Sequence, residues 1–232
     1  MLSWYEQMKT EWIYLSHLLT QELTGYRNTE ALNLKKKKKI SESASCNTSH
    51  LSLSSHFGTH IDFPYHFSDS GNKGENYRAG AFIFSEIKLV EINCLEDETE
   101  LILTDHFQEY ELCEKTEFII IKTHYTYIRN QAAYYESNPG FHPELATYLK
   151  QKCPELKIIG FDSMSLSGAK NRDVGRIAHN EFLIKNDLLI VEDMDLSNVD
   201  SSTVFGKILV SPLRFKDSDG APVTVFAEVM VD

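Results

Sequence analysis

The sequence has few cysteines, and their spacing excludes two common uses of the residue. Four occur in 232 residues, all far apart: Cys46, Cys94, Cys113 and Cys153. None belongs to a C-x-x-C pair, so neither a structural zinc knuckle nor a dithiol redox motif is supported. We expect free thiols in a reducing compartment, which points to a cytoplasmic protein.

Long apolar runs and leader-like segments are also missing. No run approaches the ~18 apolar residues that a membrane-spanning helix requires. The first segment carries Glu6 and Glu11 and has no uninterrupted apolar stretch, so it does not resemble a signal peptide. We therefore expect no membrane partner.

Positive charge is scarce. The 23 Lys and Arg residues are outnumbered by 34 Asp and Glu residues, which gives a formal net charge of −11. An acidic surface repels phosphate backbones, so we expect no nucleic-acid partner. The exception is the run Lys35–Lys39, which we interpret as a solvated loop or an exposed strand; a basic patch for an anionic partner is the alternative.

Six prolines and eleven glycines are scattered along the chain, and no linker or internal repeat divides it. We therefore predict one domain over residues 1–232. β-rich runs alternate with helical stretches, which favours a mixed α/β fold. Pro212 and Pro222 place the last two strands near an edge or mark strand ends. The predicted strands are 50–56, 81–92, 117–124, 156–162, 188–192, 204–213 and 223–231, and the predicted helices are 143–152, 173–185 and a short one from 104 to 112.

One short segment, HFGTHIDFPYH, concentrates metal-binding side chains. Three histidines and one aspartate lie within its eleven residues: His56, His60, Asp62 and His66. Imidazole and carboxylate together suit zinc, manganese or iron(II). We therefore predict a metal site here, with a polar cluster that holds no metal as the alternative.

The spacing within this segment suggests how the side chains meet. His60, Asp62 and His66 share one parity, so their side chains would leave the same side of an extended chain. Gly58 permits a reversal that brings His56 beside His60. One division of roles makes His56, His60 and Asp62 the ligands and leaves His66 free to move protons.

The pattern H-x-G-T-H-x-D-x-P-x-H resembles the signature of the cyclase-like metal-dependent hydrolase family, which includes bacterial kynurenine formamidases and isatin hydrolases. Every fixed position of that signature is met. The resemblance continues more weakly along most of the chain, at Leu15–His17, Ile159–Asp162 and His179–Glu192. It implies a swivelling β/β/α fold around a mixed, largely antiparallel sheet, and assembly as a homodimer or homotetramer.

The resemblance also implies roles for the residues of the motif. It makes three of them metal ligands: His56, His60 and Asp62. Asp62 would be a bridge if two divalent ions, zinc or manganese, are present. His66 matches the catalytic histidine of the family.

The family draws further ligands from a distal histidine and a glutamate, which would be His179 and Glu192 here. The gap between them is one residue longer than the family spacing. Either the connecting segment absorbs the extra residue, or Asp193 or Glu181 takes over, or one of two metal positions is lost. Asp162, after a predicted strand, either supports a ligating imidazole or forms a strand-end turn.

The resemblance implies hydrolysis of a small amide of formamide or lactam type, with arylformamidase-like activity. A divalent ion lowers the pKa of its water from about 15.7 toward neutrality, and His66, with an ordinary pKa near 6.5, carries a proton to the departing nitrogen. The sequence has no G-x-S-x-G elbow and no P-loop, which disfavours serine-hydrolase and nucleotide chemistry. The alternatives are a non-catalytic metal-binding scaffold and a cyclisation or dehydration at the same site.

Aromatic residues gather near the N-terminus: Trp4, Tyr5, Trp12, Tyr14 and Tyr26. We expect this arm to contact a neighbouring subunit in a homo-oligomer. Packing within the same subunit is the alternative.

Overall fold

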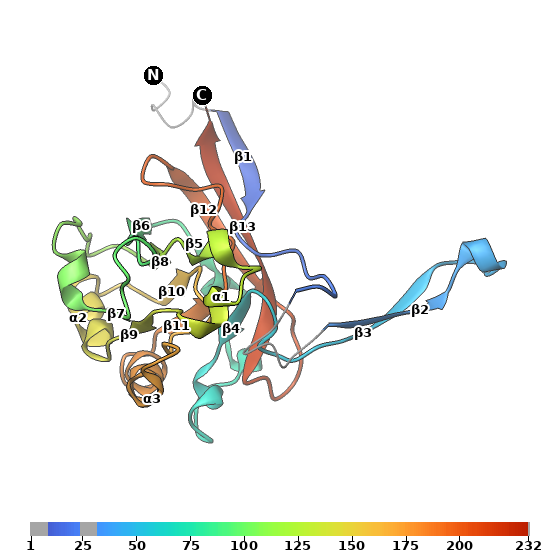
Figure 1. Cartoon of the computed structure of the whole chain (residues 1–232), viewed down its shortest axis with the longest axis horizontal. Coiled ribbons are helices and arrows are strands. Elements are labelled where there is room, and N and C mark those ends of the chain that lie inside the picture. Colours follow the sequence, from blue (N-terminus) through green and yellow to red (C-terminus); the bar gives the residue numbers. More distant parts are fainter. Residues whose placement is uncertain (1–8, 24–31, 232) are drawn as a thin grey trace.

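Most strands belong to one curved mixed sheet in the computed structural model, which describes residues 9–23 and 32–231 (Figure 1). The pairs from β11 through β10 and β8 to β6 are parallel and the others are antiparallel, so the predicted mixed, largely antiparallel sheet is confirmed. In order across the sheet the strands are β5 (Ile83–Phe84), β12 (Phe205–Pro212), β13 (Gly220–Val231), β4 (His60–Asp62), β11 (Leu189–Glu192), β10 (Ile158–Phe161), β8 (Phe118–Lys122) and β6 (Ile87–Glu91), with β1 (Lys9–Tyr14) paired to β13.

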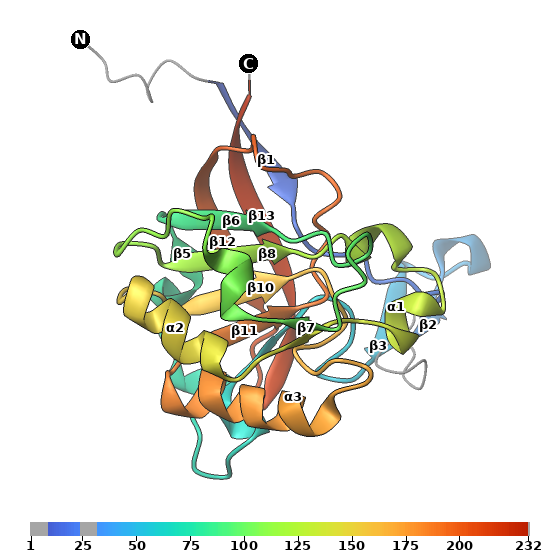
Figure 2. The same ribbon diagram turned by 60° about the vertical axis from the view of Figure 1, so that its left-hand side comes forward.

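The sheet folds over, which gives the protein two strand layers and one helix layer (Figure 2). Strand β8 shows the reason in its sequence, FIIIK. Phe118 and Ile120 belong to the core shared with the antiparallel strands, whereas Ile119 and Ile121 belong to the core under the helices. Because successive side chains of a strand point to opposite faces, an all-apolar strand needs cover on both. This is the predicted β/β/α layering.

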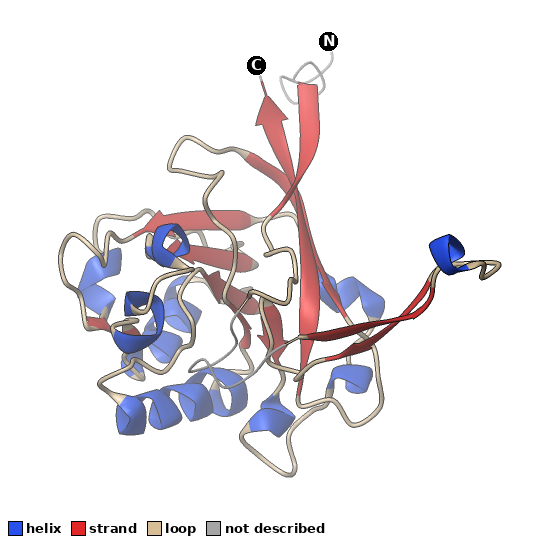
Figure 3. Cartoon of the chain, turned by 45° about the vertical axis from the view of Figure 1, so that its right-hand side comes forward, coloured by secondary structure: helices blue, strands red, loops and turns tan. Residues whose placement is uncertain are grey.

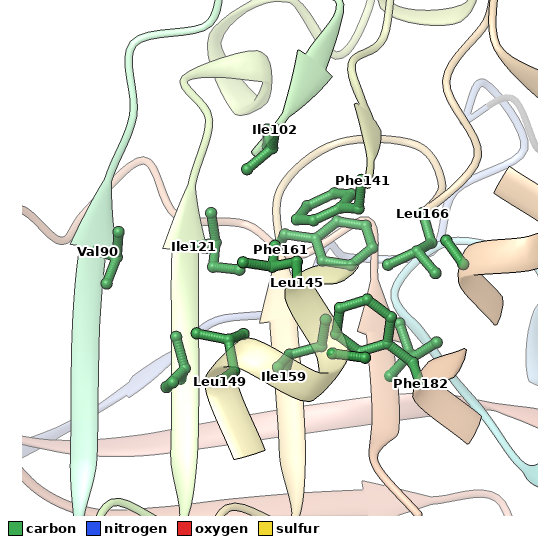
Figure 4. Packing of buried hydrophobic residues seen from close by; sticks show 14 of the residues in the cluster. Val90, Ile102, Ile121, Phe141, Leu145, Leu149, Ile159, Phe161, Leu166 and Phe182 are labelled. Carbon is green, nitrogen blue, oxygen red and sulfur yellow. The ribbon is translucent and has the colours of Figure 1, made fainter. Parts of the chain in front are cut away.

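The helix-side core lies between the parallel strands and helix α2 (Glu144–Lys152) (Figure 4). Leu145 and Leu149 of α2 are fully buried and share this cluster with Ile121 and Ile159 of the strands. Burying one such side chain contributes about 1.5–3 kcal/mol. The cluster therefore fixes the helix layer against the face of the sheet that carries the site described below.

The α-helices within the described residues are few, and each contributes buried side chains to the helix-side core (Figures 2 and 3). Besides α2 they are α1 (Ala133–Glu136) and α3 (Arg172–His179), and α3 continues into a π-helical turn, η9 (Asn180–Lys185). The predicted helix at 173–185 is therefore present in two parts. The prediction at 104–112 is wrong beyond its first turn, because only the 3-10 helix η7 (Thr104–Phe107) forms there.

Two predicted strands differ from the observed ones. The run 81–92 is interrupted: its first residues belong to the 3-10 helix η6 (Ala79–Phe82), and β5 and β6 follow as separate strands. The run 50–56 ends early, because β3 (Thr48–Ser52) stops before the turn that carries His56. Pro212 is the last residue of β12 and Pro222 lies near the start of β13, so the prolines mark strand ends, although both strands lie inside the sheet.

The lysine run is an exposed strand, one of the two predicted forms. It forms β2 (Asn33–Lys38), which pairs with β3 in a two-stranded ribbon that projects from the body (Figures 1 and 3). A second small pair joins β7 (Leu101–Ile102) and β9 (Gly140–Phe141). None of the helices within the described ranges is long and apolar enough to pass through a lipid bilayer. The predicted arm residues Trp4, Tyr5 and Tyr26 lie outside the described residues.

Candidate metal centre

Two neighbouring strands carry three of the predicted ligands on one face of the sheet. In the antiparallel register of β4 and β11, His60 lies opposite Glu192. Ile61 and Val191 point into the core shared with the antiparallel layer. Since side chains alternate along a strand, His60, Asp62 and Glu192 all point to the other face, toward the helices.

A glycine turn brings His56 to these ligands. Gly58 has a φ of +66°, in the left-handed region that favours glycine. A Cβ at this position would lie 2.4 Å from Leu19 Cδ2, so any larger residue would also have to displace the Leu19 side chain. The rings of His56 and His60 consequently lie 5.0 Å apart, nearly perpendicular at 86°. The reversal expected at Gly58 is confirmed.

His66 reaches the cluster by a different route from the predicted one. Strand β4 ends at Asp62, and Pro64–His66 form a 3-10 turn, η4, so the two-residue alternation does not extend to His66. Proline at the start of this turn fixes the local φ. The His66 ring still lies 4.1 Å from that of His56, and its side chain remains 32% exposed.

Backbone carbonyls set the orientation of two ligand candidates. His179, at the end of α3, donates from Nδ1 to a carbonyl one turn earlier at 2.8 Å. Its Nε2 therefore faces Glu192 Oε1 at 3.5 Å and Asp62 Oδ2 at 3.8 Å. His60 donates from Nδ1 to a carbonyl two residues earlier, and its Nε2 lies 3.4 Å from Glu192 Oε2. Each bond fixes the tautomer in which Nε2 is free to bind a metal.

The segment between His179 and Glu192, where the resemblance implies one extra residue, contains the π-helical turn η9. There the Asn186 N–H donates to Glu181 O, five residues back, at 3.1 Å. A turn of this kind contains more residues than an α-helical turn. The connecting segment thus absorbs the extra residue, and His179 and Glu192 remain neighbours.

Asp62 is shared by two groups of potential ligands. The ligand atoms of His56, Asp62 and His66 lie within 4.8 Å of one another, as do those of His60, Asp62 and Glu192. Asp62 Oδ1 is buried and accepts no well-aligned hydrogen bond, and its nearest polar neighbours are His56 Nδ1 at 2.9 Å and His60 Nε2 at 3.5 Å. An unsatisfied buried carboxylate oxygen is costly, and a divalent cation would satisfy it. The residues therefore fit a metal site.

The carboxylates that were alternatives to Glu192 are engaged elsewhere. Asp193 accepts two hydrogen bonds of 2.7 Å from the guanidinium of Arg129. Glu181 pairs with Lys185 at 2.5 Å. The structure thus places Glu192 in the cluster, and its role as a ligand stays a prediction.

The sequence patterns did not reveal Asp219, which directly precedes β13. The ring of His56 donates from Nε2 to Asp219 Oδ2 at 3.0 Å, and His66 Nδ1 lies 3.6 Å from the same oxygen. Gly220 allows this close approach, since a Cβ there would lie 2.5 Å from the His56 ring. Asp219 therefore orients His56, as carboxylates do behind metal-bound histidines. The Asp219-Gly220 pair, a typical turn sequence, was the available signal.

Asp162 does not support an imidazole. Its carboxylate accepts hydrogen bonds from Thr123 N at 2.6 Å, Thr123 Oγ1 at 2.7 Å and Thr126 N at 3.2 Å. These bonds tie the ends of β10 and β8 together, so the strand-end alternative is the correct one.

Carboxylates control the protonation of His56 in the cluster. Burial opposes protonation of His56, but the carboxylates of Asp62 and Asp219 outweigh it and raise its pKa to about 10. These carboxylates attract cations, and a divalent ion would displace protons from the ring nitrogens. Burial lowers the pKa of His66, and the neighbouring His56 charge adds to that effect. The His66 imidazole is therefore neutral at neutral pH and able to accept a proton.

The cluster opens into a cavity of about 340 Å³. Its wall includes Phe67, whose ring stacks 4.3 Å from that of His179, together with Met164 and two arginines, Arg172 and Arg176. Larger hollows of about 690 and 720 Å³ lie elsewhere and contain none of the predicted site residues. The smaller cavity, of ordinary size for a small-molecule site, is therefore identified by its chemistry.

Comparisons with known proteins agree with this site and fold. A profile of the family described as "Putative cyclase" matches residues 13–167, a span that includes the motif at 56–66 and ends before His179. The kynurenine formamidase of Bacillus cereus (strain ATCC 10987 / NRS 248) is 26% identical over 217 residues, which cover 93% of this chain and 97% of the relative. That of Geobacillus thermodenitrificans (strain NG80-2) is 26% identical over 216 residues, 93% of this chain and 96% of the relative.

Solved structures share the fold over almost the whole chain. Isatin hydrolase A from Labrenzia aggregata, bound to benzyl benzoate, has a TM-score of 0.80 at 16% identity and covers 96% of this chain and 94% of its own. A potential metal-dependent hydrolase with cyclase activity has a TM-score of 0.71 at 20% identity, with coverage of 95% and 98%. The predicted cyclase-like architecture is confirmed.

Proposed function

This chain belongs to the putative cyclase family, and from that premise we propose that it is a metal-dependent hydrolase of small formamides or lactams, with arylformamidase-like activity. One observation carries the proposal: two groups of ring nitrogens and carboxylates share Asp62 in a cavity that His66 also lines. The similarity to kynurenine formamidases over 93% of the chain supports the same reaction class.

The bound cation supplies Lewis acidity, which polarises a carbonyl group and makes water a stronger acid. Imidazole and carboxylate donors suit zinc or manganese, and we propose one of these two. We propose one or two ions per chain: His60, Asp62 and Glu192 would hold the first, and His56 and Asp62 would contribute to a second.

His66 moves the proton in this proposal. Amide cleavage requires a proton for the nitrogen, because an amine anion is a poor leaving group. His66 lies in the cavity wall with a lowered pKa, so it accepts a proton from water and returns it to the nitrogen. Asp219, beside His66 Nδ1, and the perpendicular ring of Phe67 hold the imidazole in place. No serine or cysteine nucleophile is required.

Removal of the cation tests the proposal. Protein supplied with zinc or manganese is expected to contain one or two ions per chain by elemental analysis and to release formate from formanilide. EDTA should abolish release, and excess metal should restore it. The metal-free protein is expected to melt at a lower temperature, since a ligand that binds only the folded state stabilises it.

Two results would contradict this function. Bound metal without hydrolysis of any formamide, lactam or aryl ester would leave a metal-binding scaffold. Hydrolysis that persists in EDTA, in protein shown to be free of metal, would remove the cation from the reaction.

We also propose that the protein is a homodimer or homotetramer. Tyr14, Phe226, Leu209 and Ile83 lie in one row across β1, β13, β12 and β5, and the two outer members are 64% and 48% exposed. The ribbon 33–52 holds five lysines and one glutamate, a charge of +4, so the rest of the chain carries −11 − 4 = −15. The acidic body of a second copy is thus complementary to the ribbon.

Light scattering is expected to give at least twice the chain mass of 26.6 kDa. Changing Lys35, Lys36 and Lys38 to glutamate should shift the protein toward the monomer, because the charge complementarity is lost. The control changes the exposed Lys115 and Lys152, outside the ribbon, and should leave the mass unchanged. A wild-type protein that is monomeric at micromolar concentration would refute the assembly.

A further inference from the structure

Two arginines on helix α3 line the cavity of the candidate metal centre. Arg172, Arg176 and His179 are separated by four and three residues, which places them on one face of the helix. All three line the cavity of about 340 Å³. His179 points into the ligand cluster, whereas Arg172 and Arg176 remain exposed.

Neither guanidinium serves the internal packing of the chain. Within residues 9–23 and 32–231, Arg172 and Arg176 form no ion pair and no side-chain hydrogen bond. Arg129 shows the contrasting structural use, since it is buried and bound by Asp193 through two hydrogen bonds. The two arginines of α3 therefore keep their donors available to a molecule in the cavity.

We propose that Arg172 and Arg176 recognise a carboxylate on the substrate and so select anionic amides; this inference rests on the proposed hydrolysis at the adjacent metal centre. A guanidinium presents parallel N–H donors that match the two oxygens of a carboxylate. Because His66 and both arginines line one cavity, a single-ring molecule can present its amide to His66 and its acid group to α3.

The charge of the site gives the arginines a second effect. Asp62, Glu192 and Asp219 occupy the inner part of the site, where they would offset the charge of a bound cation. Two positive charges in the wall attract a substrate carboxylate and orient the molecule with its acid group away from those side chains. Arg172 and Arg176 are thus specificity-determining residues, and they take no part in bond breaking.

A matched pair of substrates isolates the charge. 3-Formamidobenzoate and 3-formamidobenzamide have nearly the same size and shape and differ in one negative charge. The metal-loaded wild type is expected to favour the acid, chiefly through a lower KM. The double variant Arg172→Gln/Arg176→Gln should lose about 10- to 100-fold in kcat/KM for the acid, because hydrogen bonds between charged groups are lost. Its kcat/KM for the carboxamide should stay within about twofold.

Arg214→Gln is the control, since Arg214 is exposed and lines a different hollow.

A binding measurement separates this inference from the proposed function. Calorimetric titration of EDTA-treated protein with 3-aminobenzoate and 3-aminobenzamide requires neither metal nor turnover. Tighter binding of the acid by the wild type and by Arg214→Gln, and its loss in the double variant, support the arginine site even if no amide is hydrolysed. Equal affinity for both compounds in the wild type, or a preference for the acid that survives in the double variant, would overturn it.

Discussion

Replacing His66 with alanine is expected to lower kcat/KM for formanilide by about 10²–10⁴-fold, the usual size of a general acid–base contribution. The variant should keep its metal, because His60, Asp62, His179 and Glu192 still face one another around the same point. Formate release and elemental analysis measure the two quantities. Since burial lowers the pKa of His66 from 6.5, the acidic limb of the wild-type pH–rate profile should lie below pH 6.5 and be absent from the variant.

His106 provides the control for this substitution. It lies in η7, outside the cavity, so His106→Ala should retain full activity. His66→Ala that loses its metal together with its activity would make His66 a ligand, a role that its proximity to His56 and Asp62 permits. Wild-type turnover in the variant would remove His66 from the reaction altogether.

The Arg129→Met variant is expected to lose about 3–5 kcal/mol of unfolding free energy, the usual effect of breaking a buried ion pair. Arg129 is 4% exposed and Asp193 is 2% exposed, and Tyr134 donates a further hydrogen bond to the same carboxylate. Without the guanidinium, the buried Asp193 carboxylate, directly after Glu192, keeps only the Tyr134 hydroxyl and the His17 ring nitrogen at 3.6 Å as partners. Urea denaturation followed by fluorescence, on metal-free protein, measures the loss.

Two companion variants separate charge from packing. Arg129→Met/Asp193→Asn should recover part of the stability, because no unpaired charge remains. Lys157→Met, which breaks the largely exposed pair with Glu117, should change the midpoint little. Wild-type stability in Arg129→Met would show that the pair does not hold this part of the chain together.

The sequence pattern predicted those parts of the site whose geometry is set by residues close together in the chain. The alternation within β4 places His60 and Asp62 on one face, and Gly58 supplies the turn for His56. The apolar run of β8 predicted a central strand, because its side chains need cover on both faces. In these places the physical cause lies within a few residues.

The features that the sequence did not predict depend on distant partners. Asp219 meets His56 only because β13 pairs with β4, a contact that joins residues more than 150 positions apart. Strand β1 has no apolar alternation to mark it, and its pairing with β13 defines it. His66 lies in a 3-10 turn and not in an extended strand. The expectation that strand alternation would orient His66 was therefore wrong, although its ring reaches the cluster.

The wide turn η9 has a consequence for recognising related sequences. It takes up length between His179 and Glu192 without separating the two side chains. Chains with a different number of residues in this connection can therefore keep the same histidine and glutamate side by side. A sequence pattern that matches the end of helix α3 and the end of strand β11 separately, with a variable number of residues between them, fits this geometry.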